Sequence, residues 1–307
     1  MSLVFILAAF MTVVGLATPI LLAGLGELVV EKSGVLNLGV EGMMLMGAIS
    51  GFGTTVYTGN PWLGVIGAAV GGGASALLFA VLVLQLNSNQ VATGLALSIF
   101  GTGLSSLIGL NFTGRIVVPF GSVFPAELAK NPITQVIFGY SPIVYFALAM
   151  VPLTAWFLRS TRAGLILRAV GENDLSAHSI GYSVVRVRYA AIAFGGAMAG
   201  IGGCYFSMVI TPMWAEKMTA GRGWIALALV VFAGWRTGRL LAGAYFFGVL
   251  MALELYAKAS GFAILPSQFW AAMPYLMTVV ALSFISSRGT AGANAPACLG
   301  KPFRPSP

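Results

Sequence analysis

The stretch LVFILAAFMTVVGLATPILLAGL, residues Leu3–Leu25, decides the class of protein. It contains 23 residues and no charged side chain, and an α-helix needs roughly 17–25 mostly apolar residues to cross a bilayer. No basic segment precedes it and no cleavage site follows it, so we expect a retained membrane span and not a signal peptide. The sequence therefore predicts a chain that folds in lipid.

The remainder of the chain has the same character. Of its 307 residues, 58% are hydrophobic and only 8% are charged, whereas soluble domains carry about 25% charged residues. The segment Gly223–Trp235 has only 13 residues, too few to cross a core of about 30 Å, so it is expected to be broken or tilted. The predicted fold is all-α, a polytopic transmembrane helical bundle of about 8–10 segments. The predicted segments are Leu3–Leu25, Gly34–Tyr57, Trp62–Leu86, Val91–Phe112, Pro142–Leu158, Tyr189–Ile210, Gly223–Trp235, Leu240–Ala257 and Trp270–Ser286.

The basic residues predict an orientation. With nine segments and the N-terminus outside, eleven basic residues fall inside and five outside, as the positive-inside rule requires. A re-entrant Gly223–Trp235 would instead leave six inside and ten outside, so the nine-segment arrangement is preferred. Its inner basic residues are Lys32, Arg159, Arg162, Arg168, Arg186, Arg188, Arg236, Arg239, Arg288, Lys301 and Arg304; its outer ones are Arg115, Lys130, Lys217, Arg222 and Lys258.

Small residues recur at four-residue spacing within the predicted spans, as in Gly47/Gly51 and Gly67/Gly71. In lipid, such faces allow the backbones of two helices to approach closely. Packing within one subunit is the first interpretation, and an interface between subunits is the alternative.

A polar stretch, RSTRAGLILRAVGENDLSAHSIGYSVVRVR, separates Leu158 from Tyr189 on the predicted inner side. Asn173 or Asp174 can cap the start of a helix and Gly181 suits the position after its end, which predicts a helix of about six or seven residues. Such a helix between two spans is what an intracellular partner could push on. The alternative is an ordinary loop held inside by its arginines.

A few polar residues fall within or beside the spans. Glu41 lies one turn from Asn37, and an acid in hydrocarbon is by default a functional candidate. The pair could line the inner end of a solute path, or Glu41 could cap a broken helix or hydrogen-bond to a neighbouring span. Asn89 and Gln90 fall at an inner turn, where roles as turn and cap residues compete with solute contact. Glu27 and Glu31 are expected in a short inner loop, solvated or paired with Lys32.

Several blocks in order along nearly the whole chain resemble one family, the permeases of ATP-binding-cassette (ABC) importers for branched-chain amino acids, simple sugars and nucleosides. These permeases are also described as binding-protein-dependent transport system inner-membrane components. Asp174 replaces a frequent Pro of the family, and Arg236–Gly238 replaces a loop that often carries Pro. The first block, EKSGVLNLGVEGMMLMGA (Glu31–Ala48), is closest to the nucleoside/sugar branch. The others are GLILRAVGEN within Gly164–Met208, NQVATGLAL (Asn89–Leu97), GRGWIALALVVFAGW (Gly221–Trp235) and MPYLMT (Met273–Thr278).

The resemblance implies a type II importer-like permease domain over residues 1–288, with a cytoplasmic coupling loop at about 160–188, and a flexible cytoplasmic tail over 289–307. It implies a multi-pass protein of the plasma membrane (the bacterial inner membrane) that docks a cytoplasmic ABC ATPase, and an extracytoplasmic solute-binding protein for which the outer loop Thr113–Ser141 is a candidate surface. A second permease, identical or paralogous, is also implied. The residues expected to couple to the ATPase are Arg168, Gly171, Glu172, Asn173, Asp174, His178, Gly181 and Arg186; those expected along the solute path are Asn37, Glu41, Asn89 and Gln90.

The chain itself is not expected to be an enzyme. It has no G-x-x-x-x-G-K-[ST] phosphate loop, so ATP and magnesium are expected on the partner ATPase and no cofactor on this chain. Neither a catalytic set nor a cluster of metal ligands can be assembled around the single His178. The expected solute is small and polar, a nucleoside or simple sugar. The alternative function is a secondary transporter driven by an ion gradient, which would use membrane-embedded acids.

Overall fold

The computed structural model describes residues 3–125, 131–259, 267–287 and 295–304. Within these ranges the chain is helical, and its only paired extended residues are Ile116 and Met213, which form an isolated antiparallel bridge. The all-α prediction is confirmed. The helices are α1 (Leu3–Lys32), α2 (Val40–Thr58), α3 (Pro61–Ala80), α4 (Gln90–Gly109), α5 (Pro132–Phe138), α6 (Pro142–Ser160), α7 (Arg162–Glu172), α8 (Asp174–Ser179), α9 (Val184–Tyr205), α10 (Arg222–Phe232), α11 (Thr237–Ala259) and α12 (Ser267–Ser287). A π-helical turn, Val81–Gln85, continues α3, another, Phe206–Ile210, continues α9, and a 3-10 turn, Leu110–Phe112, follows α4.

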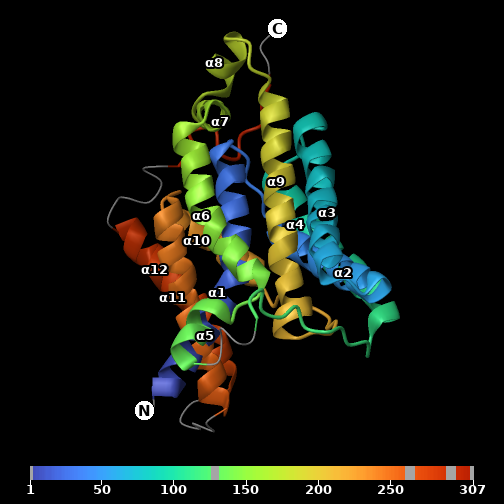
Figure 1. Cartoon of the computed structure of the whole chain (residues 1–307). Helices are drawn as coiled ribbons and strands as arrows, with labels where there is room; N and C mark the ends of the chain where they lie inside the picture. The colour runs from blue at the N-terminus through green and yellow to red at the C-terminus, as the bar shows by residue number, and fades with distance from the viewer. Residues whose placement is uncertain (1–2, 126–130, 260–266, 288–294, 305–307) are drawn as a thin grey trace.

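The bundle has two distinct ends (Figure 1). α7, α8 and the C-terminus lie at one end, and the N-terminus and α5 lie at the other. The first end carries the basic loop that the sequence assigns to the inner side, so it is called the inner end here.

Six of the described helical stretches are long and apolar enough to cross a membrane, which confirms a polytopic membrane protein. α2 and α12, with 19 and 21 residues, are further helices of the bundle. α10 has only 11 residues, about 16 Å, as expected for a segment that cannot span alone. The six stretches are Val4–Lys32, Pro61–Gln85, Gln90–Phe112, Pro142–Ser160, Val184–Ile210 and Thr237–Ala259.

The first inner loop is shorter than the sequence predicted. α1 continues through Lys32, so Glu27 and Glu31 lie within a helix and are 1% and 0% exposed. The expectation that they are solvated loop residues is wrong. Each carboxylate instead accepts a hydrogen bond from a distant residue: Glu27 from Asn37 and Glu31 from the indole N–H of Trp235.

The segment that follows α1 enters the bundle without helical structure. The predicted span Gly34–Tyr57 is helical only from Val40. Leu38 runs beside α4, where its carbonyl accepts a hydrogen bond from Ser98 Oγ (2.8 Å). Irregular backbone is tolerated at membrane depth only where it is buried in protein or faces a water-filled cavity, and here it is buried against α4.

The glycines bring helix backbones into direct contact. A Cβ on Gly47 of α2 would lie 2.2 Å from the Cα of Gly200 in α9, and a Cβ on Gly72 of α3 would lie 2.7 Å from the same atom. A side chain at Gly47 or Gly72 would overlap the facing backbone, so these contacts require glycine at both positions. They lie within one chain, which supports the first interpretation of the small-residue faces.

Replacing Gly47 with valine is therefore expected to prevent α2 and α9 from closing and to lower the free energy of unfolding by about 3 kcal/mol or more. The measurement is the yield of monodisperse protein and its thermal unfolding midpoint in detergent. Gly103→Val in α4 is the matched control, because a Cβ there meets nothing within 4 Å. An equal fall in yield and in unfolding midpoint for both variants would contradict the prediction.

Candidate coupling site at the inner end

Two short helices form the polar loop between α6 and α9. Thr161 caps α7, since its Oγ1 accepts the amide of Gly164 (3.0 Å). Asn173 caps α8, since its Oδ1 accepts the amide of Ser176 (2.9 Å). α8 has six residues, and Gly181 follows it with a φ of +94°. The predicted short helix and both of its ends are confirmed, whereas α7 was not predicted.

The eight residues expected to contact an ATPase divide into two groups. The side chains of Glu172, Asn173, His178 and Arg186, and also Gly181, are exposed at the inner end. Arg168 is half-buried, and Gly171 and Asp174 are buried. The second group faces the bundle, so it can fix the position of the first.

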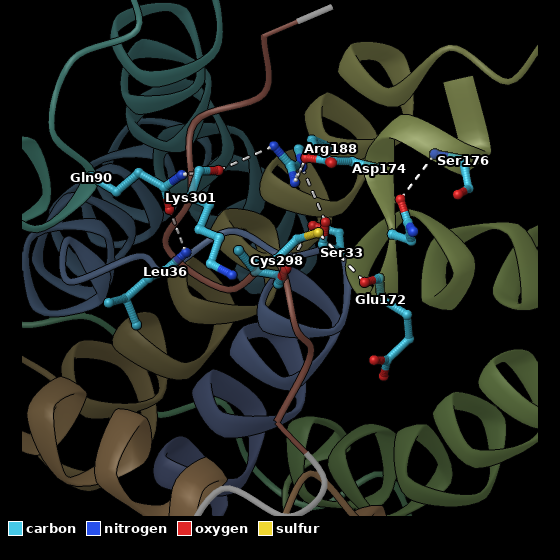
Figure 2. Close-up of polar contacts among 11 residues, drawn as sticks. Ser33, Leu36, Gln90, Glu172, Asp174, Ser176, Arg188, Cys298 and Lys301 are labelled. Carbon is cyan, nitrogen blue, oxygen red and sulfur yellow. Dashed lines mark hydrogen bonds and ion pairs between the residues drawn. The ribbon is translucent and has the colours of Figure 1, made fainter. Parts of the chain in front are cut away.

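An ion pair joins α8 to the bundle. Arg188 of α9 is fully buried, and its Nη2 lies 3.0 Å from Oδ2 of Asp174. Its Nε donates to the carbonyl oxygen of Ser33, just after α1 (3.2 Å). Figure 2 shows this guanidinium between α8 and the end of α1. The sequence placed Arg188 among the inner basic residues, and no sequence signal showed that it would be buried.

α7 also touches the end of α1 directly. A Cβ on Gly171 would lie 2.2 Å from the carbonyl oxygen of Lys32. Gly34 opposite has a φ of +89°, which favours glycine. The close approach therefore requires glycine at position 171, and the left-handed backbone favours it at position 34.

Residues 295–304, named the C-terminal segment here, return to this site. The amide of Cys298 donates to the carbonyl of Gly171 (2.9 Å), and the amide of Gly300 donates to that of Gly34 (3.2 Å). Phe303 packs edge-on against His178. These residues were expected in a flexible tail, but they make defined contacts; the rest of that predicted tail, 289–294 and 305–307, lies outside the described residues.

Gln90 connects the C-terminal segment to α4 and to the segment entering the bundle. Its Oε1 accepts the amide of Leu36 (2.8 Å), and its Nε2 donates to the carbonyl of Lys301 (3.4 Å), which also accepts from Arg188 Nη1 (3.5 Å) (Figure 2). Asn89 caps α4 through the amide of Ala92 (3.0 Å). Asn89 is therefore a helix cap, whereas Gln90 makes contacts between segments that are distant in the sequence.

Asn37 and Glu41 do not act as one pair. Asn37 is fully buried, donates through Nδ2 to Glu27 Oε2 (3.2 Å) and accepts the amide of Gly39 (3.0 Å). It holds the turn that redirects the chain into α2.

Glu41 faces the start of α10. Its Oε1 accepts from Thr219 Oγ1 (2.6 Å) and the amide of Gly221 (2.8 Å), and its Oε2 accepts the amide of Gly223 (2.7 Å). The carboxylate thus satisfies amides at the N-terminus of the short apolar helix α10, where negative charge is favoured. This geometry supports the interpretation of Glu41 as a cap for a neighbouring segment.

Sequence reasoning missed the apolar part of the exposed surface. Leu175, Ile180 and Tyr182 are 51%, 71% and 41% exposed around α8. The sequence could have indicated them, because large apolar side chains in a polar loop outside the membrane have no lipid to cover them. Among the described residues no group of three His, Cys, Asp or Glu side chains could hold a metal ion.

Comparison with known proteins identifies the family. The model for the branched-chain amino acid transport system permease component matches residues 9–282. A putative glucose ABC transporter permease protein of Haloferax volcanii, TsgC13, is 41% identical over 87% of this chain and 88% of its own length. The guanosine ABC transporter permease protein NupQ of Bacillus subtilis is 30% identical over 94% and 93%. The nucleoside ABC transporter permease protein NupC of Lactococcus lactis is 27% identical over 90% and 91%. The chain therefore belongs to the branched-chain amino acid transport system permease family and is a multi-pass permease subunit of an ABC transporter in the plasma membrane.

Proposed function

We propose that a separate cytoplasmic ATPase docks on α8 and drives this permease between its open and closed forms. The observation that carries the proposal is the exposed apolar group of Leu175, Ile180 and Tyr182 on a helix fixed from behind by a buried ion pair. A group of exposed apolar side chains outside the bilayer marks a surface that a partner protein can cover.

The same contacts provide a route for movement into the bundle. Force on α8 reaches Arg188 through Asp174, and Arg188 holds both Ser33 and Lys301. Lys301 in turn contacts Gln90 at the start of α4. A tilt of α8 would therefore move the ends of α1 and α4 together, on either side of the segment that enters the bundle.

The sequence supports a source of energy on another chain. The only Gly-Lys pair, Gly300-Lys301, is followed by Pro302 and forms no phosphate loop. ATP and magnesium then belong to the partner, and this chain is a non-catalytic subunit without a cofactor of its own.

The proposed solute is a nucleoside or simple sugar. The named relatives are glucose, guanosine and nucleoside permeases, and the described bundle has few fixed charges to match a charged solute. Asn37 and Glu41 would shape the path by fixing the start of α2 and α10, while Asn89 and Gln90 would shape its inner end.

An extracytoplasmic binding protein and a second permease, identical or paralogous, complete the proposed importer. The outer loop Thr113–Ser141 leaves Ile116 and Val118 71% and 85% exposed at the end opposite α8, which suits a docking surface. Residues 126–130 of this loop lie outside the described residues.

Replacing Ile180 with aspartate is expected to abolish co-purification of the ATPase, because a charge replaces the most exposed apolar contact of α8. The measurement is affinity purification from the native membrane followed by mass spectrometry, which also shows whether the second permease is a paralogue. Val118→Asp, at the opposite end, is the matched control and should retain the ATPase. If the wild-type chain has no ATPase and transports alone in liposomes under an ion gradient, the chain is a secondary carrier.

A further inference from the structure

A small basic pocket lies at the inner end, on the flank of the coupling site. Its cavity of about 190 Å³ lies between the ends of α1 and α6, α7 and the turn that joins α10 to α11. Its lining residues are Lys32, Ala155, Leu158, Arg159, Arg168, Gly234, Trp235, Arg236 and Thr237. Four cationic side chains from four separate elements thus converge on one cavity.

The charge of this pocket is only partly offset. Two carboxylates act on the same cluster: Glu31, which accepts the indole N–H of Trp235, and Glu172, which attracts Lys32. Four cations against two carboxylates leave a net positive site. The Nε of Arg168 is buried there, without a hydrogen-bond partner among the described residues.

The turn that closes the pocket is strained. Gly234 and Trp235 have φ values of +56° and +54°, and the left-handed conformation is costly for a tryptophan. Trp235 is held there by its 2.5 Å hydrogen bond to Glu31. This turn places Arg236 and the N-terminal residue of α11, Thr237, at the cavity. Strain of this kind persists where the surroundings enforce it and often marks a functional site.

The chemistry of the lining selects the ligand. Arginine side chains and a helix N-terminus both favour a phosphate group. The cavity is smaller than the roughly 300–1,000 Å³ typical of whole-ligand pockets, so it suits a single head group. Ala155 and Leu158 line its apolar wall near the end of a membrane span.

We propose that this pocket binds the phosphate group of an anionic phospholipid of the inner leaflet. Basic pockets between membrane helices on the cytoplasmic side are suited to such head groups. The bound lipid would join α6, α7 and the α10–α11 turn, and so would brace the flank of the coupling site.

The test measures the thermal unfolding midpoint of the full chain, purified in detergent with the subunits that accompany it. Phosphatidylglycerol, phosphatidylcholine or inorganic phosphate is added to the wild type and to Arg159→Ala/Arg236→Ala. Both arginines are exposed, so in the absence of lipid the double variant should have the same unfolding midpoint as the wild type. Phosphatidylglycerol should raise the unfolding midpoint of the wild type. The double variant should need a phosphatidylglycerol concentration at least about tenfold higher for the same rise.

Arg162→Ala is the matched control, because Arg162 is an exposed arginine at the start of α7 and does not line the pocket; this variant should respond like the wild type. Native mass spectrometry should show retained phosphatidylglycerol on the wild type and Arg162→Ala but not on the double variant. An equal effect of inorganic phosphate would assign the site to the free anion and overturn the lipid. Stabilisation by phosphatidylcholine, or an unchanged response of the double variant, would overturn the pocket as a phosphate site.

Discussion

The variant Asp174→Ala is expected to lose about 3–5 kcal/mol of folding stability, because it leaves the fully buried guanidinium of Arg188 without its carboxylate. Two of the remaining partners of Arg188 are backbone carbonyls, which cannot neutralise a charge. The measurement is the thermal unfolding midpoint in detergent, together with ATPase-coupled transport, which should fall with it.

The double variant Asp174→Ala/Arg188→Met tests whether the uncompensated charge of Arg188 causes the loss of stability. Removing both charges is far less costly than removing one, so the double variant should recover a large part of the midpoint while transport stays low. A double variant no more stable than Asp174→Ala would show that charge burial is not the reason. Lys258→Ala serves as a control: it breaks a more exposed pair with Glu254 and should cost about 0–1 kcal/mol.

The variant Glu41→Ala is expected to release the N-terminus of α10. It leaves the amides of Gly221 and Gly223 and the hydroxyl of Thr219 without their acceptor. Each buried polar group without a partner lowers the folding stability by about 1–3 kcal/mol. Hydrogen exchange should therefore accelerate in peptides that cover residues 221–227, and transport should fall.

Two comparisons define this effect. Glu41→Gln keeps an amide oxygen as acceptor and should show an intermediate exchange rate. Exchange in α8 should not change, because the hydrogen-bond partners of the Glu41 carboxylate all lie at residues 219–223. Unaltered exchange at 221–227 in Glu41→Ala would mean that α10 does not depend on this cap.

The sequence predicted the helices better than their connections. Apolar runs located the spans because lipid requires them, and Asn173 and Gly181 located the ends of α8 because capping is local chemistry. The burial of Glu27 and Glu31 could not be predicted, since their partners Asn37 and Trp235 come 10 and 204 residues later. The same reason applies to Arg188, whose charge predicted an inner position but not a buried one.

The site was predicted in part. A short capped helix in a basic loop indicated where a partner could act, and resemblance to a family named the partner class. The apolar residues Leu175 and Ile180 were visible in the sequence but were overlooked beside the charged ones. The return of the C-terminal segment to Gly171 could not be foreseen, because a Gly/Ala/Pro-rich stretch after the last span has no periodic pattern of its own.

The position of the C-terminal segment has a consequence for the order of biogenesis. Residues 295–304 are translated after every described helix, yet they make hydrogen bonds to Gly34 and Gly171, which leave the ribosome far earlier. Until they arrive, Arg188 has no contact with Lys301, and His178 has no contact with Phe303. An ATPase that recognises the finished inner end would therefore find it complete only on chains whose last membrane helix has already been made.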